Sequence, residues 1–206
     1  MAIKPASPAH SQQPGVQDGR RNRTVETRKR IVKALTELIK EGQVAPTAEE
    51  VSVRANVGLR TVFRHFDDME TLYREINNEL QTIVQAMVHM EFESATWQDR
   101  LLESIKVRAR LYESITPFFL SAQVHRHGSS MINANIQSGV GLERATLKKL
   151  LPREIPLDRP RFEALVMVLS PEAWVRLRRE QGLSFSAALA ALQIAAKEIA
   201  LFGGQP

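Results

Sequence analysis

Apolar residues recur along most of the chain at the three- and four-residue spacing of amphipathic helices, and no stretch keeps the alternation of a strand. Ile31, Leu35 and Leu38 form one such stripe, which predicts a helix over 24–40 that ends before Gly42. The same spacing predicts further helices over 47–55, 59–66, 68–90, 96–112, 118–126, 130–151, 161–181 and 184–202. The pattern therefore predicts an all-α protein.

The segment 47–66 predicts two short helices joined by a tight turn. Thr47 and Glu50 have the spacing of a capping box, which begins the first helix. Asn56 tolerates the left-handed conformation that the turn requires, and Gly58 can start the second helix. This order of elements is that of a helix-turn-helix, which lays its second helix in the DNA major groove.

Proline and glycine punctuate the remainder of the chain. Pro117 is expected to end or kink the helix that precedes it. Gly139 and Gly141 weaken the helix predicted over 130–151. Pro171 either kinks one helix or begins a second. The helices predicted over 161–181 and 184–202 are separated by Gly182, so the C-terminal part is expected to form a helical hairpin.

The last helix is apolar around almost its whole circumference, because only Gln193, Lys197 and Glu198 are polar between positions 187 and 201. Such a helix must be covered on nearly every side. We expect the same hairpin of a second copy to cover it, in a four-helix interface about a two-fold axis; the alternative is a helix buried within a monomer. The interface residues expected are Leu177, Leu189, Leu192, Ala196 and Ile199.

Composition narrows the class of protein. The chain has no cysteine, which excludes disulfides, thiol nucleophiles and thiolate metal sites. No apolar run approaches the roughly 20 residues of a membrane span, and the first thirty residues lack a signal-type segment. We therefore expect a cytoplasmic protein without membrane contact.

Positive charge is concentrated beside the helix-turn-helix. Residues 1–66 carry 12 Lys/Arg against 6 Asp/Glu, whereas residues 67–206 carry 16 against 17. Phosphates of duplex DNA attract such a surplus, although a solvated basic face is the alternative. Residues 1–22, rich in Pro, Ser, Gln and Gly, are expected to form a disordered basic arm, either an inert tail or a further DNA contact through its arginines.

The stretch from Thr27 to about Leu80 resembles the DNA-binding domain of the TetR family of bacterial transcriptional regulators. The segments that carry the resemblance are TRKRIVKALTELIKEG, PTAEEVSVRANVGLRTVFRHF and DMETLYREI. The C-terminal segment LSPEAWVRLRREQGLSFSAALAAL is similar to the dimerising hairpin of some members. The resemblance implies a helix-turn-helix domain over 23–70, a larger helical domain over 71–206 for effector binding and dimerisation, and a homodimeric repressor released from its operator by a small molecule.

The resemblance also implies which residues touch DNA. Arg60 and Thr61 are expected at base edges with Leu59 beside them, since arginine suits bidentate contact with guanine. Phe63 stands where the family usually has tyrosine and lacks its hydroxyl. The residues expected at the phosphate backbone are Thr47, Phe63, Arg64 and His65. A simple cap at Thr47, an interior histidine at His65 and a solvated charge at Arg60 are the alternatives.

Two departures from the family pattern weaken expected DNA contacts. Glu49 falls where a basic residue is frequent, so the helix over 47–55 is expected to contribute little base reading. Met69 stands where the family often has a phosphate-binding lysine, and Asp67 and Asp68 beside it would repel phosphate. Compensation is expected from Arg21, Arg23, Arg28 and Lys29.

The middle of the chain, about 91–150, matches no motif, and the resemblance implies only that it is the effector-binding part. Its aromatic and Met residues are more often core than pocket, but pockets are lined mainly by such residues, so the effector is expected to be small and largely apolar. The candidate residues are Gln85, His89, Trp97, Arg108, Phe118, Phe119, Gln123 and Met131. A regulator controlled by a protein partner, or an all-α enzyme, are the alternatives. We expect no metal site, since His125 and His127 point apart on a helix and the chain has no cysteine. We expect no catalytic site or cofactor, since the sequence has no nucleophile motif and no Gly-rich phosphate loop.

Overall fold

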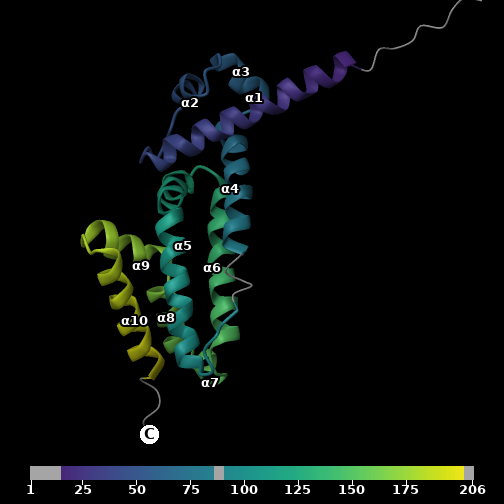
Figure 1. The fold of residues 1–206 in the computed structure, drawn as a ribbon. Coiled ribbons are helices and arrows are strands. Elements are labelled where there is room, and N and C mark those ends of the chain that lie inside the picture. The colour runs from purple at the N-terminus through teal and green to yellow at the C-terminus, as the bar shows by residue number, and fades with distance from the viewer. Residues whose placement is uncertain (1–14, 86–90, 202–206) are drawn as a thin grey trace, which may run out of the picture.

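In the computed structural model, which describes residues 15–85 and 91–201, all regular structure is helical, as the sequence predicts (Figure 1). The elements are α1 (Gly15–Lys40), α2 (Ala48–Arg54), α3 (Leu59–His65), α4 (Met69–Gln85), α5 (Trp97–His125), α6 (Ser130–Leu150), α7 (Glu154–Leu157), α8 (Arg159–Val168), α9 (Pro171–Val175), the π-helical turn η1 (Arg176–Glu180) and α10 (Phe185–Leu201). None of the helices in these ranges combines the length and the hydropathy needed to cross a membrane.

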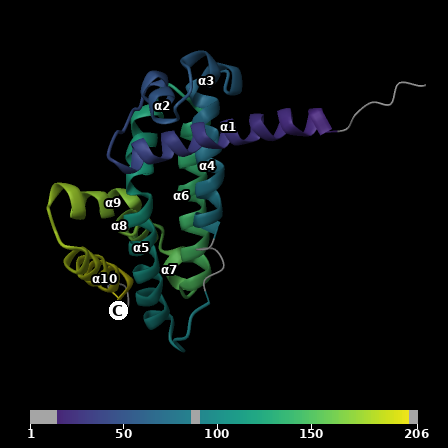
Figure 2. The same cartoon turned by 45° about the horizontal axis from the view of Figure 1, so that its top comes forward.

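The first helix is longer than the sequence pattern predicts. It begins at Gly15 rather than near Thr24, so residues 15–22 are helical and not part of a disordered arm. This segment extends a helix already formed over the later residues of α1, and adding a residue to an existing helix gains one backbone hydrogen bond without the cost of a new nucleus. The first half of α1 projects beyond the other helices (Figure 2). The rest of the expected arm, residues 1–14, lies outside the described residues.

Helices α1, α2 and α3 pack around one core, which also takes in the start of α4. Ile31 and Leu35 from α1 meet Val51 from α2 and Val62 from α3, and each of these side chains is at most 1% exposed. The capping box of α2 is present, and Asn56 adopts a left-handed φ of 51° in the turn. These findings confirm the predicted helix-turn-helix, here called the head.

Helix α4 leads from the head into the larger domain. Its start is capped by Asp68, whose Oδ1 accepts a hydrogen bond of 2.7 Å from the Thr71 backbone N–H. Figure 1 shows α4 running alongside α6, with α5 next to it. The predicted extension of this helix to Met90 lies outside the described residues.

Helix α5 corrects the prediction that Pro117 divides this region into two helices. It runs without a break from Trp97 to His125 with Pro117 inside it. Proline removes one helical hydrogen bond, which costs about 3 kcal/mol. The side chains of Tyr112 and Phe118, on either side of the proline, are 2% and 8% exposed, so burial along one continuous face offsets that cost. The Thr116 hydroxyl also donates a 2.6 Å hydrogen bond to the Tyr112 carbonyl.

The C-terminal hairpin forms as the sequence suggests, with a second helix starting at Pro171. Ser170 caps α9, Gly182 ends the following turn with a φ of +67°, and the hydroxyl of Ser184 accepts the Ala187 N–H at the start of α10. Helix α10 packs against α8 and α5, and it lies on the outside of the larger domain in Figure 1.

The burial along α10 corrects part of the expected dimer interface. Leu192 and Ala196 are 3% and 0% exposed because they pack into the core of their own subunit. Side chains expected with them, at Leu177, Leu189 and Ile199, are partly buried against that same core. The opposite face of α10 presents apolar side chains to solvent, with Ile194 at 65% and Leu201 at 47% exposed. The sequence located the apolar helix but not the direction in which each side chain points.

Candidate nucleic-acid interface and ligand pocket

Helix α3 lies at the end of the molecule opposite α7 (Figure 1). Its exposed face is polar and basic. Arg60 and Arg64 are exposed, and Thr61 is partly so. Two apolar side chains share this face, Leu59 at 36% and Phe63 at 47% exposure. Because Val62 and Phe66 are buried on the other side, the helix has one face for the core and one for a partner.

Arg28 on α1 fixes the C-terminal end of α3. Its guanidinium donates a 2.6 Å hydrogen bond to the backbone carbonyl of His65, lies over the Phe66 ring at 4.1 Å, and pairs with Glu75 of α4 at 2.7 Å. Arg28 is therefore engaged within the head, and the expectation that it compensates for missing phosphate contacts is corrected. Three elements meet at this one side chain.

His65 contributes hydrogen-bonding capacity to the exposed face of α3 rather than charge. Partial burial lowers its pKa, and the neighbouring positive charges of Arg64 and Arg28 lower it further. The imidazole is therefore neutral at pH 7. Thr47 is exposed, and its hydroxyl oxygen accepts the Glu50 N–H in the capping box, which leaves the hydroxyl proton available to a phosphate.

Negative charge borders the basic face at the start of α4. Asp67 and Asp68 are exposed, and hydrogen bonds from Thr71 lower the pKa of Asp68, which keeps its carboxylate charged. Glu49 on α2 is exposed as well. On α2, Arg54 pairs with Glu41 at 2.6 Å. The positive charge directed outward from the helix-turn-helix is thus that of α3, at Arg60 and Arg64.

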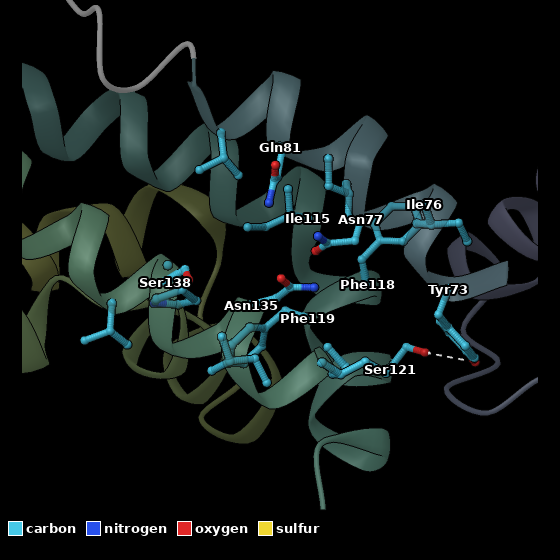
Figure 3. Close-up of a pocket in the computed structure, with 18 of the residues that line it drawn as sticks. Tyr73, Ile76, Asn77, Gln81, Ile115, Phe118, Phe119, Ser121, Asn135 and Ser138 are labelled. Carbon is cyan, nitrogen blue, oxygen red and sulfur yellow. Dashed lines mark hydrogen bonds between the residues drawn. The ribbon is translucent and has the colours of Figure 1, made fainter. Parts of the chain in front are cut away.

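A cavity of about 230 Å³ lies between α4, α5 and α6, with the start of α9 at one end (Figure 3). Most of its wall is apolar, with Ile76, Ile115 and Phe119 among the lining side chains. Figure 3 shows the amides of Asn77 and Gln81 from α4 and of Asn135 from α6 turned toward the space between the helices. Apolar walls with a few polar groups are typical of sites for small organic ligands.

The wall of the cavity is continuous with the core of the head. Ile39 of α1, Ile76 of α4 and Phe118 of α5 line the cavity and also belong to the head core. Tyr73 of α4 lines the cavity too, and its ring lies 4.7 Å from that of His125. A molecule that displaces these side chains therefore acts directly on packing beneath α1 and α4.

Two carboxylates lie at the end of the cavity near α9. Glu143 of α6 is 7% exposed, whereas Glu172 is exposed. Burial raises the pKa of Glu143 to about 7, and Glu172 raises it as well, against the opposing effects of the Arg108 charge and a hydrogen bond with Tyr112. The carboxyl therefore holds a proton at higher pH than an exposed glutamate does.

Arg108 and Tyr112 form a buried polar layer behind Glu143. Arg108 is 1% exposed and donates hydrogen bonds of 3.3 Å to the Tyr112 hydroxyl and 2.7 Å to the Thr146 hydroxyl. The Tyr112 hydroxyl donates in turn to the Leu169 carbonyl at 2.8 Å, and burial raises the pKa of Tyr112. This layer holds the phenol of Tyr112, which lines the cavity, in one position.

The expected effector residues divide into three groups. Phe118, Phe119 and Met131 line the cavity. Arg108 lies behind its wall, Gln123 accepts a hydrogen bond from Arg126 outside it, and Trp97 lines a separate small cavity near the end of α10, so these three predictions are corrected. His89 and the side chain of Gln85 lie outside the described residues.

Sequence reasoning missed the polar side chains of the cavity. Tyr73, Asn77 and Gln81 are spaced by four residues and share one face of α4 with Ile76 and Leu80. This spacing places a polar stripe beside an apolar one on α4, and it could have predicted that these polar side chains face the interior. In the described parts of the chain, no three His, Asp or Glu side chains gather as they would around a metal ion.

Three solved structures share this fold. A transcriptional regulator from Rhodococcus sp. Rha1 is 18% identical and superimposes with a TM-score of 0.66 over 85% of this chain and 96% of its own. A regulator from Streptomyces coelicolor A3(2) is 17% identical, with a TM-score of 0.54 over 83% of this chain and 98% of its own. A TetR-family regulator from Mesorhizobium loti MAFF303099 is 14% identical, with a TM-score of 0.54 over 88% and 98%.

The similarity is one of structure. No protein-family model matches the sequence, and no curated protein matches it. The three solved neighbours are transcriptional regulators and not enzymes, and the chain spans nearly all of each of them. The chain therefore has the TetR-like fold that its N-terminal motif predicts.

Proposed function

We propose that this TetR-like protein is a homodimeric transcriptional repressor that a small, largely apolar molecule releases from its operator. The observation that carries the proposal is the exposed face of α3, where Arg60, Thr61 and Arg64 project from a helix-turn-helix whose other face is buried. Side chains of these types, on a helix in this position, match the donors and acceptors of the major groove.

The chemistry of α3 divides into base contacts and backbone contacts. Arg60 and Thr61 near its N-terminus are proposed to contact base edges, because the start of a recognition helix points into the groove. Phe63 and Leu59 supply apolar surface for thymine methyl groups or sugars. Arg64, neutral His65 and the Thr47 hydroxyl are proposed to position the head on phosphates.

Dimerisation is proposed through the exposed face of α10 together with α8. Ile194 and Leu201 of α10 and Met167 of α8 are 65%, 47% and 67% exposed, and the two helices pack against each other. The alanines at positions 187 and 190 lie on the same exposed face and allow a second helix to approach closely. A two-fold pair of hairpins there would present two heads to one duplex, as pseudo-palindromic sites require.

Effector control is proposed to act through the shared wall of the cavity. A ligand that moves Phe118, Ile76 or Ile39 changes the packing on which the head rests, and hence the relative position of two heads in a dimer. A ligand that prefers the geometry unsuited to DNA lowers the affinity of the protein for DNA. By linkage, bound DNA lowers the affinity of the protein for the ligand by the same factor. The cavity supports this scheme over control by a protein partner alone, which a filled core would have favoured.

Selection of duplexes from a random library by the purified protein tests the DNA part of the proposal. We expect enrichment of a pseudo-palindromic sequence whose half-sites contact α3, with binding that weakens steeply as salt increases. Recovery of no common sequence, or binding independent of salt, would contradict a sequence-specific role. An unrelated protein carried through the same selection controls for bias in the library.

A further inference from the structure

We propose that the cavity takes an amphiphilic cation, with an ammonium group held at Glu143 and an apolar body along α4, α5 and α6. The inference rests on the proposed effector function and adds the chemical class of the ligand. The observation that supports it is the charge of the side chains that line the cavity. Among the described lining residues, the ionic side chains are Glu143 and Glu172, and no Lys, Arg or His lines the cavity.

The buried position of Glu143 makes an uncompensated negative charge costly there. A carboxylate removed from water is stable only when paired or hydrogen-bonded. The nearest buried cation is Arg108, but within the described ranges no ion pair joins it to a carboxylate, because its terminal nitrogens bond to Tyr112 and Thr146. Glu143 and Glu172 thus line the cavity, whereas the guanidinium that interacts with Glu143 lies behind the wall.

Burial, with the neighbouring charge of Glu172, raises the proton affinity of Glu143. Its pKa of about 7 means that the carboxyl takes up a proton more readily than an exposed glutamate does, which lowers the negative charge of the wall. An ammonium group bound at the same place would replace that proton and donate charge-assisted hydrogen bonds. An anionic group would add a third negative charge beside two carboxylates.

The rest of the wall fits an uncharged, mainly hydrocarbon body. Ile76, Ile115, Phe118 and Phe119 supply apolar surface, and the amides of Asn77 and Gln81 supply neutral polar contacts (Figure 3). A volume of about 230 Å³ accommodates a chain of several carbons or a small ring system. The cavity is therefore apolar along its length and negative at one end.

Titration calorimetry with three probes of equal chain length tests the inference on the full-length protein. The probes are octylammonium, 1-octanol and octanoate. At pH 8 we expect octylammonium to bind about tenfold or more tightly than octanol, which corresponds to about 1.4 kcal/mol, and octanoate to bind most weakly. Glu143→Gln should bring octylammonium to the affinity of octanol. The exposed Glu154→Gln on α7 is the matched control and should keep the preference.

A pH series supplies a second readout. The titratable and charged groups that face Glu143 are Arg108 and Tyr112 on α5 and Glu172 on α9. Burial raises the pKa of Glu143 to about 7. Octylammonium affinity should therefore fall by several-fold from pH 8 to pH 6, while octanol affinity stays constant. Circular dichroism checks that Glu143→Gln folds. If it does not fold, Glu172→Gln, at the exposed carboxylate, replaces it in the test and should weaken the preference for octylammonium by a smaller factor.

The outcomes separate this inference from the proposed function. Equal or tighter binding of octanol or octanoate by the wild-type protein would overturn the ligand class and leave the effector pocket standing. Binding of none of the three probes would overturn the inference together with effector control, while DNA selection would still test the head independently. A preference for octylammonium that survives in Glu143→Gln would overturn the assigned position of the charge.

Discussion

The guanidinium of Arg28 lies 4.1 Å from the centroid of the Phe66 ring and donates a 2.6 Å hydrogen bond to the carbonyl of His65, the last residue of α3. Arg28 belongs to α1 and also pairs with Glu75 of α4. The C-terminal end of the proposed recognition helix is thus attached to the two helices that frame the head. An arginine that composition alone would assign to phosphate binding serves to position α3.

Arg28→Ala is expected to lower the free energy of unfolding by about 1–2 kcal/mol, because it removes one cation–π contact, one charged hydrogen bond and one half-exposed ion pair. DNA affinity should fall to a similar extent on all sequences, since α3 loses its support rather than a base contact. Urea unfolding and fluorescence anisotropy measure the two effects. Lys149→Ala, at an exposed residue of α6 outside the head, is the control and should change neither.

Arg60→Ala is expected to weaken binding to the selected operator by about 1–3 kcal/mol and to relax preference at one base pair of each half-site, because a bidentate contact to guanine would be lost. Affinity for an unrelated duplex should change little by comparison. Anisotropy titrations with both duplexes measure the ratio. Arg153→Ala, an exposed arginine at the opposite end of the molecule, serves as the control; an unchanged operator preference in Arg60→Ala would show that α3 is not the recognition helix.

Two neighbouring substitutions on α10 separate the proposed dimer interface from the subunit core. Ile194 is 65% exposed, so Ile194→Glu should leave each subunit folded and yield monomers. Leu192 is 3% exposed in its own core, so Leu192→Glu should unfold the protein by burying a charge, at a cost of about 3 kcal/mol or more. Analytical ultracentrifugation and thermal unfolding measure both. A dimer that persists in Ile194→Glu would place the interface elsewhere.

The stability of the protein is expected to depend on pH through Glu143. Its pKa is raised from 4.5 in the unfolded chain to about 7 in the folded one, so the folded state holds the proton more tightly. The stabilising contribution is full below about pH 4.5 and is lost as pH rises through about 7, a total of roughly 3 kcal/mol. Glu143→Gln should therefore be more stable than the wild type at pH 8 and similar at pH 4.5. Urea unfolding of both proteins at pH 8 and pH 4.5 tests this. An equal difference in the free energy of unfolding at the two pH values would contradict the raised pKa of Glu143.

The head was predictable because its signals are local. The capping box of Thr47 and Glu50 and the turn residues Asn56 and Gly58 each need only a few neighbours in sequence to act, and all of them form as predicted. The expectation that Pro117 ends its helix was wrong because continuation of the helix depends on tertiary burial, which the sequence pattern does not contain. The same holds for Leu192, whose direction is decided by which side of α10 meets α8 and α5.

The cavity was less predictable because it belongs to three helices at once. Phe118, Phe119 and Met131 were identified as apolar candidates, yet nothing in the sequence distinguishes an apolar side chain at a cavity from one in a filled core. Asn77, Gln81 and Asn135 resemble solvent-facing residues until α4 and α6 are placed opposite each other. Glu143 likewise becomes unusual only when its burial is known.

Two glycines of α6 provide the most direct test of the cavity. Gly139 lines it and Gly141 is exposed, and a Cβ added at either position meets no atom within 4 Å. Replacing either glycine by leucine should raise the helix propensity of α6 by about 0.5–1 kcal/mol. The side chain at position 139 would occupy the cavity, whereas that at 141 would extend into solvent.

Gly139→Leu is therefore expected to bind operator DNA with wild-type affinity but to lose release by the ligand, and Gly141→Leu is expected to keep both properties. Competition between operator and octylammonium, followed by anisotropy, measures release in the three proteins. Because the two substitutions change the same helix by the same side chain, a loss of response confined to Gly139→Leu assigns the effect to the volume of the cavity. Loss of response in both variants would instead point to the rigidity of α6, and retention in both would exclude this cavity as the effector site.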